Sequence, residues 1–332
     1  MNCPYCKSEA NLKLENKRIT YRKEEFDFFQ QFYKCGKCNQ EFTTTEIDEV
    51  NINQVYNQYR EKYQIPFPEQ LKNIRQKYGL TPTKMSEILG FGINIYRNYE
   101  KGEVPNLSNG TLLNLVRTPD EFSKIIENKK HLFSSKQFVK LTTHIEKLIE
   151  QEKKTDNYKK FLWDENIIPN EFTGYKTPSF DKFANMVLFF LENNPNLFKV
   201  RLNKLLFYSD FYHYKKFGFS ISGFRYQAIQ MGPVPYRYDV IYDLLWEENY
   251  IEYELADINE NMVDKPIPKI TFNEKVFEKS ELETLTLISN KLKKLSKDEL
   301  VDISHNEKCW IEEHKQKGII SYKKYGFELK IS

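Results

Sequence analysis

Four of the five cysteines in this chain fall into two C-x2-C pairs, and this pattern limits the possible fold more than any other feature of the sequence. The pairs are Cys3-Pro-Tyr-Cys6 and Cys35-Gly-Lys-Cys38. Each pair places two thiolates at a distance that suits one tetrahedral ion, so the two pairs together predict a four-thiolate zinc site. Such a closed site stabilises a fold and leaves no coordination position open for catalysis. The alternative is a redox-active C-x-x-C pair.

The stretch between the two cysteine pairs is long for a zinc ribbon, but antiparallel strands can fill it. Tyr33 and Phe42 flank the second pair, where we expect both rings to pack against it. We therefore predict a small β-containing domain over residues 1–62, whose structural Zn²⁺ is bound by Cys3, Cys6, Cys35 and Cys38.

The composition limits the class of protein only loosely. With 332 residues the chain is long enough for two or three domains, and its formal net charge of +3 by itself argues for neither a nucleic-acid nor a membrane partner. No basic segment followed by an apolar run opens the sequence, and the longest apolar run, residues 186–191, is far too short to span a membrane. We therefore expect a cytoplasmic protein. The heavy use of Lys, Asn, Ile, Tyr and Phe resembles the product of AT-rich coding DNA and suggests a bacterial or phage gene.

Residues 67–105 predict three short helices. The first ends at Gly79, and the second begins at an N-cap, Thr81, that is followed by proline. Gly90 ends the second helix, and the third lies within residues 91–105. Three short helices with a tight, glycine-containing turn between the second and the third are typical of a helix-turn-helix.

The third helix carries three long polar side chains that a core helix would not need, namely Asn94, Arg97 and Asn98. Asparagine pairs with adenine and arginine with guanine through two hydrogen bonds each, so these residue types suit the reading of base edges. Lys84 and Lys101 are expected to contact DNA phosphates. The alternative is a three-helix module that only packs or dimerises.

This segment resembles the XRE/Cro-like helix-turn-helix. The resemblance rests on the R-x-x-x-G-L-T pattern at residues 75–81 and on Tyr-Glu-Lys-Gly at residues 99–102. It implies that the third helix enters the DNA major groove, and that Arg75 and Glu100 form an ion pair. We expect a five-helix domain of this kind over residues 63–130.

The combination of a four-cysteine domain and a Cro-like domain resembles the MqsA-type zinc-finger antitoxins of bacterial toxin–antitoxin pairs. The resemblance covers about residues 1–130 and rests on CPYC, CGKC and SEILGFGINIYRNYEKG. In that family an asparagine and, four residues later, an arginine read the operator. Here Asn94 fills the first position, but Asn98 fills the second, and Arg97 comes one residue earlier. This difference leaves the operator sequence open, but not the DNA-binding role.

Residues 131–174 are expected to form a helical linker. Its first part has apolar residues at near-heptad spacing, which predicts an amphipathic helix that packs on either neighbour or pairs with a second copy. Proline and glycine residues at 167–179 mark the next boundary.

Residues 175–332 predict a separate α-rich domain with a small antiparallel sheet. Three helices are expected here. Ser179 caps the first, the second ends at Gly218, and the third runs from Pro235 through Trp246. Strands are predicted at residues 250–255 and 269–272. Two further helices should begin at capping boxes, whose residues are Ser280 with Glu283 and Ser296 with Glu299.

This domain shows no pattern of catalytic residues. It has no phosphate-binding loop and no HExxH motif, and GFSISG at residues 218–223 misses the spacing of a nucleophile elbow by one residue. His213 and His305 have no carboxylate or serine at a spacing that suggests a base, and Cys309 is expected to be a small buried hydrophobic residue. We therefore predict that the protein is not an enzyme.

Residues 204–241, KLLFYSDFYHYKKFGFSISGFRYQAIQMGPVPYRYDVI, resemble the Panacea (SocA-like) antitoxin domain, and DISHNEKCW at residues 302–310 supports the match. Members of that family neutralise toxins encoded beside them by direct contact. Aromatic side chains dominate protein interfaces, so an exposed aromatic cluster is the expected toxin-binding surface. The alternative for each ring is a place in the core. The residues are Phe211, Tyr212, Tyr214, Tyr226 and Tyr236.

Together these observations predict a mainly α, multidomain antitoxin of a type II toxin–antitoxin system. Its expected partners are a protein toxin, double-stranded operator DNA and a second copy of the chain, because operators of this kind are palindromes. The alternative is a zinc-containing transcriptional regulator whose C-terminal domain senses a ligand or adapts a client to a protease. A zinc-dependent enzyme acting on nucleic acid would need an open metal position and a nearby base, and neither is visible.

Overall fold

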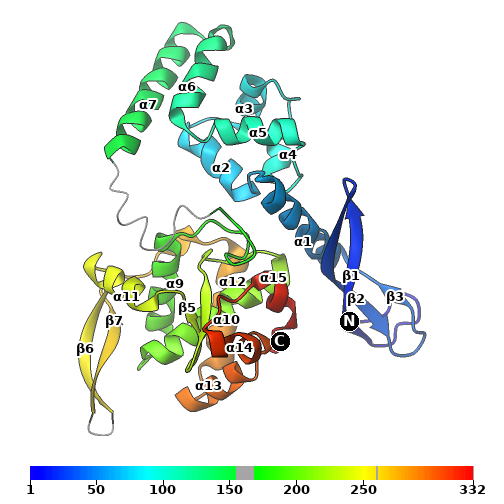
Figure 1. The fold of residues 1–332 in the computed structure, drawn as a ribbon, viewed down its shortest axis with the longest axis vertical. Helices are drawn as coiled ribbons and strands as arrows, with labels where there is room; N and C mark the ends of the chain where they lie inside the picture. The colour runs from blue at the N-terminus through cyan, green and yellow to red at the C-terminus, as the bar shows by residue number, and fades with distance from the viewer. Residues whose placement is uncertain (155–167, 259–260, 332) are drawn as a thin grey trace. The chain divides into compact units, whose positions relative to one another are not determined.

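The computed structural model describes residues 1–154, 168–258 and 261–331 (Figure 1). Helices dominate and the sheets are small and antiparallel, so the predicted fold class, mainly α and multidomain, is confirmed. The chain divides into two compact units, of which the first comprises Met1–Val55 and Lys160–Ser332 and the second Tyr56–Lys159. Within the described ranges, every helix is too short or too polar to traverse a lipid bilayer.

The N-terminal part of the first unit is a three-stranded antiparallel sheet of β1 (Ala10–Tyr21), β2 (Glu24–Cys35) and β3 (Glu41–Phe42). The register pairs Ala10 with Cys35 and Tyr21 with Glu24, so the stretch between the cysteine pairs is a β-hairpin, as predicted. The rings of Tyr33 and Phe42 stack across β2 and β3 with their centroids 5.6 Å apart. The hairpin therefore returns the chain to the first cysteine pair.

Helix α1 (Thr45–Tyr63) follows the sheet, and its side-chain amides satisfy one edge of β2. Asn51 accepts the N–H of Gln31 at 2.8 Å and donates to its carbonyl at 2.9 Å. Gln54 makes the same pair of bonds with Phe29, both at 2.9 Å. A buried backbone group without a partner is costly, and these two amides supply the partners that a further strand would otherwise provide.

Unit 2 consists of short helices that pack around one apolar core. Thr81 caps α3 by accepting the N–H of Lys84 at 3.1 Å, and Gly90 ends it in the left-handed conformation, with φ of 72°. Both ends of this helix are as predicted. The helices are α2 (Pro68–Lys77), α3 (Pro82–Leu89), α4 (Ile95–Glu100), α5 (Leu107–Leu115), α6 (Pro119–Asn128) and α7 (Ser135–Lys154).

Helix α7 occupies the first part of the expected linker, and it packs on the helices that precede it. Its Leu141 and Ile145 are buried in the same core as Tyr78 and Phe122. Lys77 Nζ also reaches a carboxylate oxygen of Glu152 at 2.5 Å. The sequence left open whether this helix packs on either neighbour or pairs with a second copy. In the structure it packs on its N-terminal neighbour, within unit 2.

The C-terminal part of the first unit is built around α10, which contacts α9, α12, α13 and the hairpin of β4 and β5. Most side chains along α10 are buried, which explains its apolar and aromatic character. The elements are α9 (Phe180–Asn193), α10 (Lys199–Phe217), β4 (Tyr226–Ile229), β5 (Gly232–Pro235), α11 (Tyr238–Glu247), β6 (Ile251–Ile258), β7 (Asn261–Pro268), α12 (Lys279–Leu292), α13 (Lys297–His305), α14 (Lys308–Glu313) and α15 (Tyr322–Tyr325).

Some of the predicted elements of this part are correct and others are wrong. Ser179 caps α9, and the capping box of Ser296 and Glu299 opens α13. The box predicted at Ser280 is wrong, because α12 begins two residues earlier, with Glu278 as its N-cap. The strand predicted at residues 269–272 is also wrong: β6 pairs with residues 261–268 instead, since the chain turns back directly after β6.

Candidate functional site

The two cysteine pairs meet in one cluster, in which the four Sγ atoms all lie within 4.8 Å of one another. Cys3 and Cys35 are buried, and their partners are half-buried. The two turns are built alike: in each, the residue after the second cysteine has a positive φ and donates its N–H to the carbonyl of the first. Lys7 does this at 3.0 Å and Asn39 at 3.2 Å. The local turns thus aim all four thiols at one point.

Hydrogen bonds favour the thiolate, which is the form that binds metal, at two of the four cysteines, whereas burial and the neighbouring thiols raise the pKa of Cys38 to about 12. Hydrogen bonds from the backbone N–H groups of Cys38 and Lys37 lower the pKa of Cys35. Hydrogen bonds from Ser8 lower the pKa of Cys6 to about 6. Four converging sulfur donors with hydrogen-bonded thiolates fit a soft divalent ion held in a closed site. The fifth cysteine, Cys309, differs: burial raises the pKa of its thiol, so this thiol is not activated.

Helix α4 presents the three predicted base-reading residues to solvent. Asn94, Arg97 and Asn98 are all exposed, whereas Tyr96 and Tyr99 on the other side of the helix are buried. The structure therefore brings the three polar residues together on one exposed face.

Hydrogen bonds from the buried face fix the position of α4. The hydroxyl of Tyr96 donates to the carbonyl of Leu71 at 2.9 Å, and its backbone N–H donates to Ser86 Oγ at 3.0 Å. Asn109 Nδ2 donates to the hydroxyl of Tyr99 at 2.8 Å. These bonds tie α4 to α2, α3 and α5, so a short helix is held rigidly by its neighbours.

The ion pair implied by the Cro-like resemblance is confirmed. Arg75 Nε lies 2.5 Å and its Nη2 3.3 Å from the two carboxylate oxygens of Glu100. The side chains are only 17% and 13% exposed, and Arg75 Nη1 also donates to the carbonyl of Leu80 at 3.0 Å. One guanidinium thus joins α2 to the end of α4 and to the turn before α3.

The two lysines predicted to contact phosphate lie in different surroundings. Lys101 is exposed at the end of α4. Lys84 Nζ donates to the carbonyl of Leu132 at 2.6 Å and pairs with Glu87 at 2.8 Å, and it lies 4.3 Å from the centre of the Phe133 ring. Much of the bonding capacity of Lys84 is thus already used within unit 2.

Two residues around α4 were missed by sequence reasoning. Arg60 is 1% exposed, and its Nη2 donates to the carbonyl of Gly102 at 2.6 Å, which fixes the segment after α4. No local pattern marks an arginine of α1 for this contact. Ile93 is 71% exposed beside Asn94, although its apolar side chain suggests a place in the core. Gly92, directly before Ile93, is the sequence signal that the buried face of the helix begins after Ile93.

The predicted aromatic surface of the C-terminal part is wrong in three of its five members. Phe211, Tyr214 and Tyr226 are buried, and Phe211 stacks on Tyr322 with ring centroids 4.0 Å apart. Phe211 and Tyr214 lie on the buried part of α10, and Tyr226 lies on β4, whose hairpin packs against that helix. Tyr212 and Tyr236 are half-buried and keep some accessible surface.

A buried carboxylate organises the loop that follows α10. Asp210 accepts the N–H groups of Ile221 and Ser222, both at 2.8 Å, and the hydroxyls of Ser222 and Tyr226 at 2.5 and 2.8 Å. Burial raises the pKa of Asp210, and these donors oppose the shift. The bonds are internal to the fold, so Asp210 shapes the loop and does not offer a reactive group.

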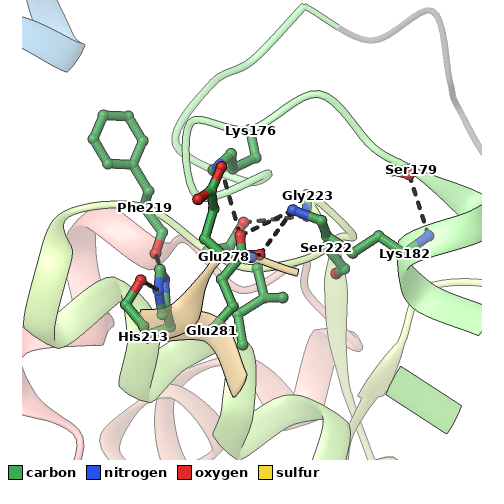
Figure 2. A network of polar contacts seen from close by, with 12 residues as sticks. Lys176, Ser179, Lys182, His213, Phe219, Ser222, Gly223, Glu278 and Glu281 are labelled. Carbon is green, nitrogen blue, oxygen red and sulfur yellow. Dashed lines mark hydrogen bonds and ion pairs between the residues drawn. The ribbon is translucent and has the colours of Figure 1, made fainter. Parts of the chain in front are cut away.

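A second polar network connects α9, α10 and α12 (Figure 2). Lys182 Nζ contacts both carboxylate oxygens of the buried Glu281, at 2.9 and 3.0 Å, and Lys176 Nζ lies 3.8 Å from one of them. The nearby His213 contacts the carbonyl of Phe219 through Nδ1 at 2.7 Å and the hydroxyl of Ser280 through Nε2 at 3.4 Å. Every group has a partner within the fold, so this network stabilises the domain.

Comparison with protein families identifies two regions of the chain. Residues 1–127 match the family described as the antitoxin component of a bacterial toxin–antitoxin system, MqsA. Residues 202–311 match the SocA-like antitoxin Panacea domain. Comparison with curated proteins gives no match. The chain therefore joins a region similar to the MqsA antitoxins, which contains the cysteine cluster and α4, to a region similar to the Panacea domain of SocA-like antitoxins.

Proposed function

We propose that this protein is the antitoxin of a type II toxin–antitoxin system. It binds and neutralises a protein toxin encoded beside it, and it represses its own operon by binding operator DNA as a homodimer. The observation that carries the proposal is the presence of matches to two antitoxin families, over separate residues, in one chain. All of these roles are binding roles, so we propose no enzymatic activity.

The metal of the cysteine cluster is proposed to be Zn²⁺, bound by Cys3, Cys6, Cys35 and Cys38. The ion would supply a crosslink between the two ends of the β1–β2 hairpin, and its binding free energy would then be folding free energy. Support comes from the four sulfur donors and from the hydrogen bonds that lower the pKa of Cys35.

DNA binding is assigned to α4 as the recognition helix of a helix-turn-helix formed with α3. Asn94, Arg97 and Asn98 would contact base edges, with Lys84 and Lys101 near phosphates. Support comes from the exposure of the three polar side chains on a helix whose tyrosines are anchored in the core. The exposed Ile93 is suited to contact a thymine methyl group.

The DNA-binding assignment is tested with the promoter DNA of the protein's own gene. Replacement of Asn94, Arg97 and Asn98 by alanine should abolish specific binding, since each good bidentate contact contributes roughly 1–3 kcal/mol of discrimination. Weak, salt-dependent binding to any duplex should remain. Lys124→Ala with Asn128→Ala, on the exposed side of α6, is the control. Full specific binding by the triple variant in fluorescence anisotropy would contradict the assignment.

Toxin neutralisation is tested by co-expression with the small protein encoded beside this gene. The full chain should restore growth when that protein alone arrests it. The neighbouring protein could instead be harmless, or harmful but unaffected by this chain. Either result would favour the alternative, a zinc-containing transcriptional regulator whose C-terminal domain senses a ligand or serves as a proteolytic adaptor.

A further inference from the structure

A strongly acidic segment lies in the C-terminal part of the first unit. Residues 238–264, bounded by Arg237 and Lys265, contain no lysine or arginine, although the whole chain has a net charge of +3. The acidic residues of this segment are Asp239, Asp243, Glu247, Glu248, Glu252, Glu254, Asp257, Glu260 and Asp264. Glu260 lies outside the described residues, and we call the other residues of this set and their surroundings the acidic face.

The described acidic residues of this segment are all exposed, on α11 and on the ribbon of β6 and β7. Glu254 pairs with Lys265 at 2.6 Å. Five others form no ion pair with any residue in the described ranges, and these are Asp239, Asp243, Glu247, Glu252 and Asp264. Most of the negative charge is therefore available to a partner.

Helix α11 packs beside β6, which brings the charges of α11 next to one face of the ribbon. Burial raises the pKa of Tyr253, and the carboxylates of Asp243 and Asp264 add to the shift, to about 12. Asp243 is on α11 and Asp264 on β7, and Lys199 Nζ lies 4.6 Å from the centre of the same tyrosine ring. Opposite Asp264 in the register is Leu255.

Large apolar side chains lie exposed among these charges. Trp246 on α11 is 56% exposed, Leu255 on β6 is 68% exposed and Met262 on β7 is 63% exposed. Met262 pairs with Asp257 and Leu255 with Asp264, so Leu255 and Met262 project from the same face of the ribbon. The ribbon extends from its unit as two strands without a third (Figure 1). Exposed apolar side chains with a polar rim are typical of protein interaction sites.

The charge decides which partner suits this face. Nucleic acids and anionic membranes are repelled by it, and two copies of the same face repel each other. A protein that presents basic residues around an apolar contact is complementary in both respects. We propose that the acidic face of α11 and the β6–β7 ribbon is the surface that binds the toxin, and that the toxin presents a basic surface to it. This inference rests on the proposed function.

The test uses the full chain and the protein encoded beside its gene. Four exposed acidic residues that make no ion pair with a described residue are neutralised together, by Asp239→Asn, Asp243→Asn, Glu247→Gln and Asp264→Asn. Glu252 is left unchanged because it projects from the other face of the ribbon. The control removes the same charge from exposed positions outside the acidic face, by Glu274→Gln, Glu283→Gln, Asp298→Asn and Asp302→Asn. A third variant, Leu255→Ser with Met262→Ser, removes apolar contact area without changing the charge.

The wild-type chain should bind the neighbouring protein in isothermal titration calorimetry, with an affinity that falls as salt is added. The acidic-face variant should bind at least about tenfold more weakly and with a smaller salt dependence, and the apolar variant should also be weakened. The control should stay within about twofold of wild type. Hydrogen exchange of the wild-type complex should show protection over residues 251–268, and unchanged circular dichroism should show that the variants are folded.

Each outcome decides the matter. If the wild-type chain neither binds the neighbouring protein nor protects cells from it, the proposed function fails and this inference fails with it. If the wild-type chain binds and protects but the acidic-face variant binds as tightly as the control, only this inference is overturned. The acidic residues would then serve to keep an open strand edge from pairing with other chains. The inference is also overturned if hydrogen exchange shows protection at another surface and none over the β6–β7 ribbon.

Discussion

Glu100 and Arg75 form a largely buried ion pair that joins α4 to α2. Replacing Glu100 by alanine leaves a guanidinium that is only 17% exposed without its carboxylate, and an unpaired charge of this kind costs on the order of 3 kcal/mol. We expect calorimetry of the full chain to show that the transition of unit 2 moves to lower temperature.

The matched control for this prediction is Glu87→Ala, because Glu87 pairs with Lys84 but is 48% exposed. An exposed pair contributes roughly 0–1 kcal/mol, so this variant should melt close to wild type. Equal effects of the two substitutions would show that the Arg75–Glu100 pair is not a special support of α4.

We expect His213 to make the stability of the C-terminal part depend on pH. Burial lowers the pKa of His213 to about 3, and the charges of Lys176 and Lys182 act in the same direction. An unfolded histidine binds its proton near pH 6.5, so between these values the unfolded state binds more protons and stability falls as the pH is lowered. The contribution of this residue should fall by about 2 kcal/mol from pH 7 to pH 5.

Urea unfolding followed by tryptophan fluorescence measures this effect. His213→Asn should lose this part of the pH dependence, even if it is less stable at every pH. His131→Asn, which removes an exposed histidine of unit 2, should keep it. A pH slope unchanged in His213→Asn would show that other groups cause it.

At the scale of the element, the β1–β2 hairpin depends on the cysteine cluster at its ends. Cys35→Ser removes one of the four proposed ligands, so we expect this variant not to retain Zn²⁺ and its N-terminal sheet to unfold. Atomic absorption gives the zinc content, and loss of the Tyr33–Phe42 ring contact in NMR reports the sheet. Cys309→Ser is the control and should retain the metal. Full zinc occupancy in the Cys35 variant would contradict the four-thiolate assignment.

The sequence predicted correctly those features that depend only on residues close together in the chain. The cap at Thr81, the stop at Gly90 and the turns around the cysteine pairs are set by backbone preferences of a few neighbouring residues, and they are where the sequence places them. The Arg75–Glu100 pair was found through resemblance, since no local rule connects positions this far apart.

Features that depend on tertiary packing were predicted poorly. Phe211, Tyr214 and Tyr226 have the composition of an interface, but only the packing of the β4–β5 hairpin against α10 shows that they form the core. The partner strand of β6 was placed too late because residues 261–268 contain two prolines and an acidic residue, which weaken a strand pattern. In contrast, the absence of basic residues from 238–264 is visible in the sequence, but the shared surface with exposed Trp246 is visible only in the structure.

At the scale of the whole molecule, reading DNA and silencing a toxin should be separable. The alanine variant of Asn94, Arg97 and Asn98 should lose specific DNA binding and still protect cells, because the proposed toxin surface lies on other elements. The acidic-face variant should bind promoter DNA normally and protect poorly. Co-expression measures protection and fluorescence anisotropy measures DNA binding, and both assays are done on each full-length variant. Loss of both activities in either variant would show that the two functions share a surface.

At high concentration, long strands in an open hairpin ordinarily recruit strands from neighbouring molecules, and this is a common route to aggregation. The donors and acceptors of Phe29 and Gln31 on the outer edge of β2 are already taken by the amides of Gln54 and Asn51. An incoming chain finds no free backbone group at these positions, and it would first have to displace a helix. Two side-chain amides thus protect part of the hairpin edge from pairing with another chain.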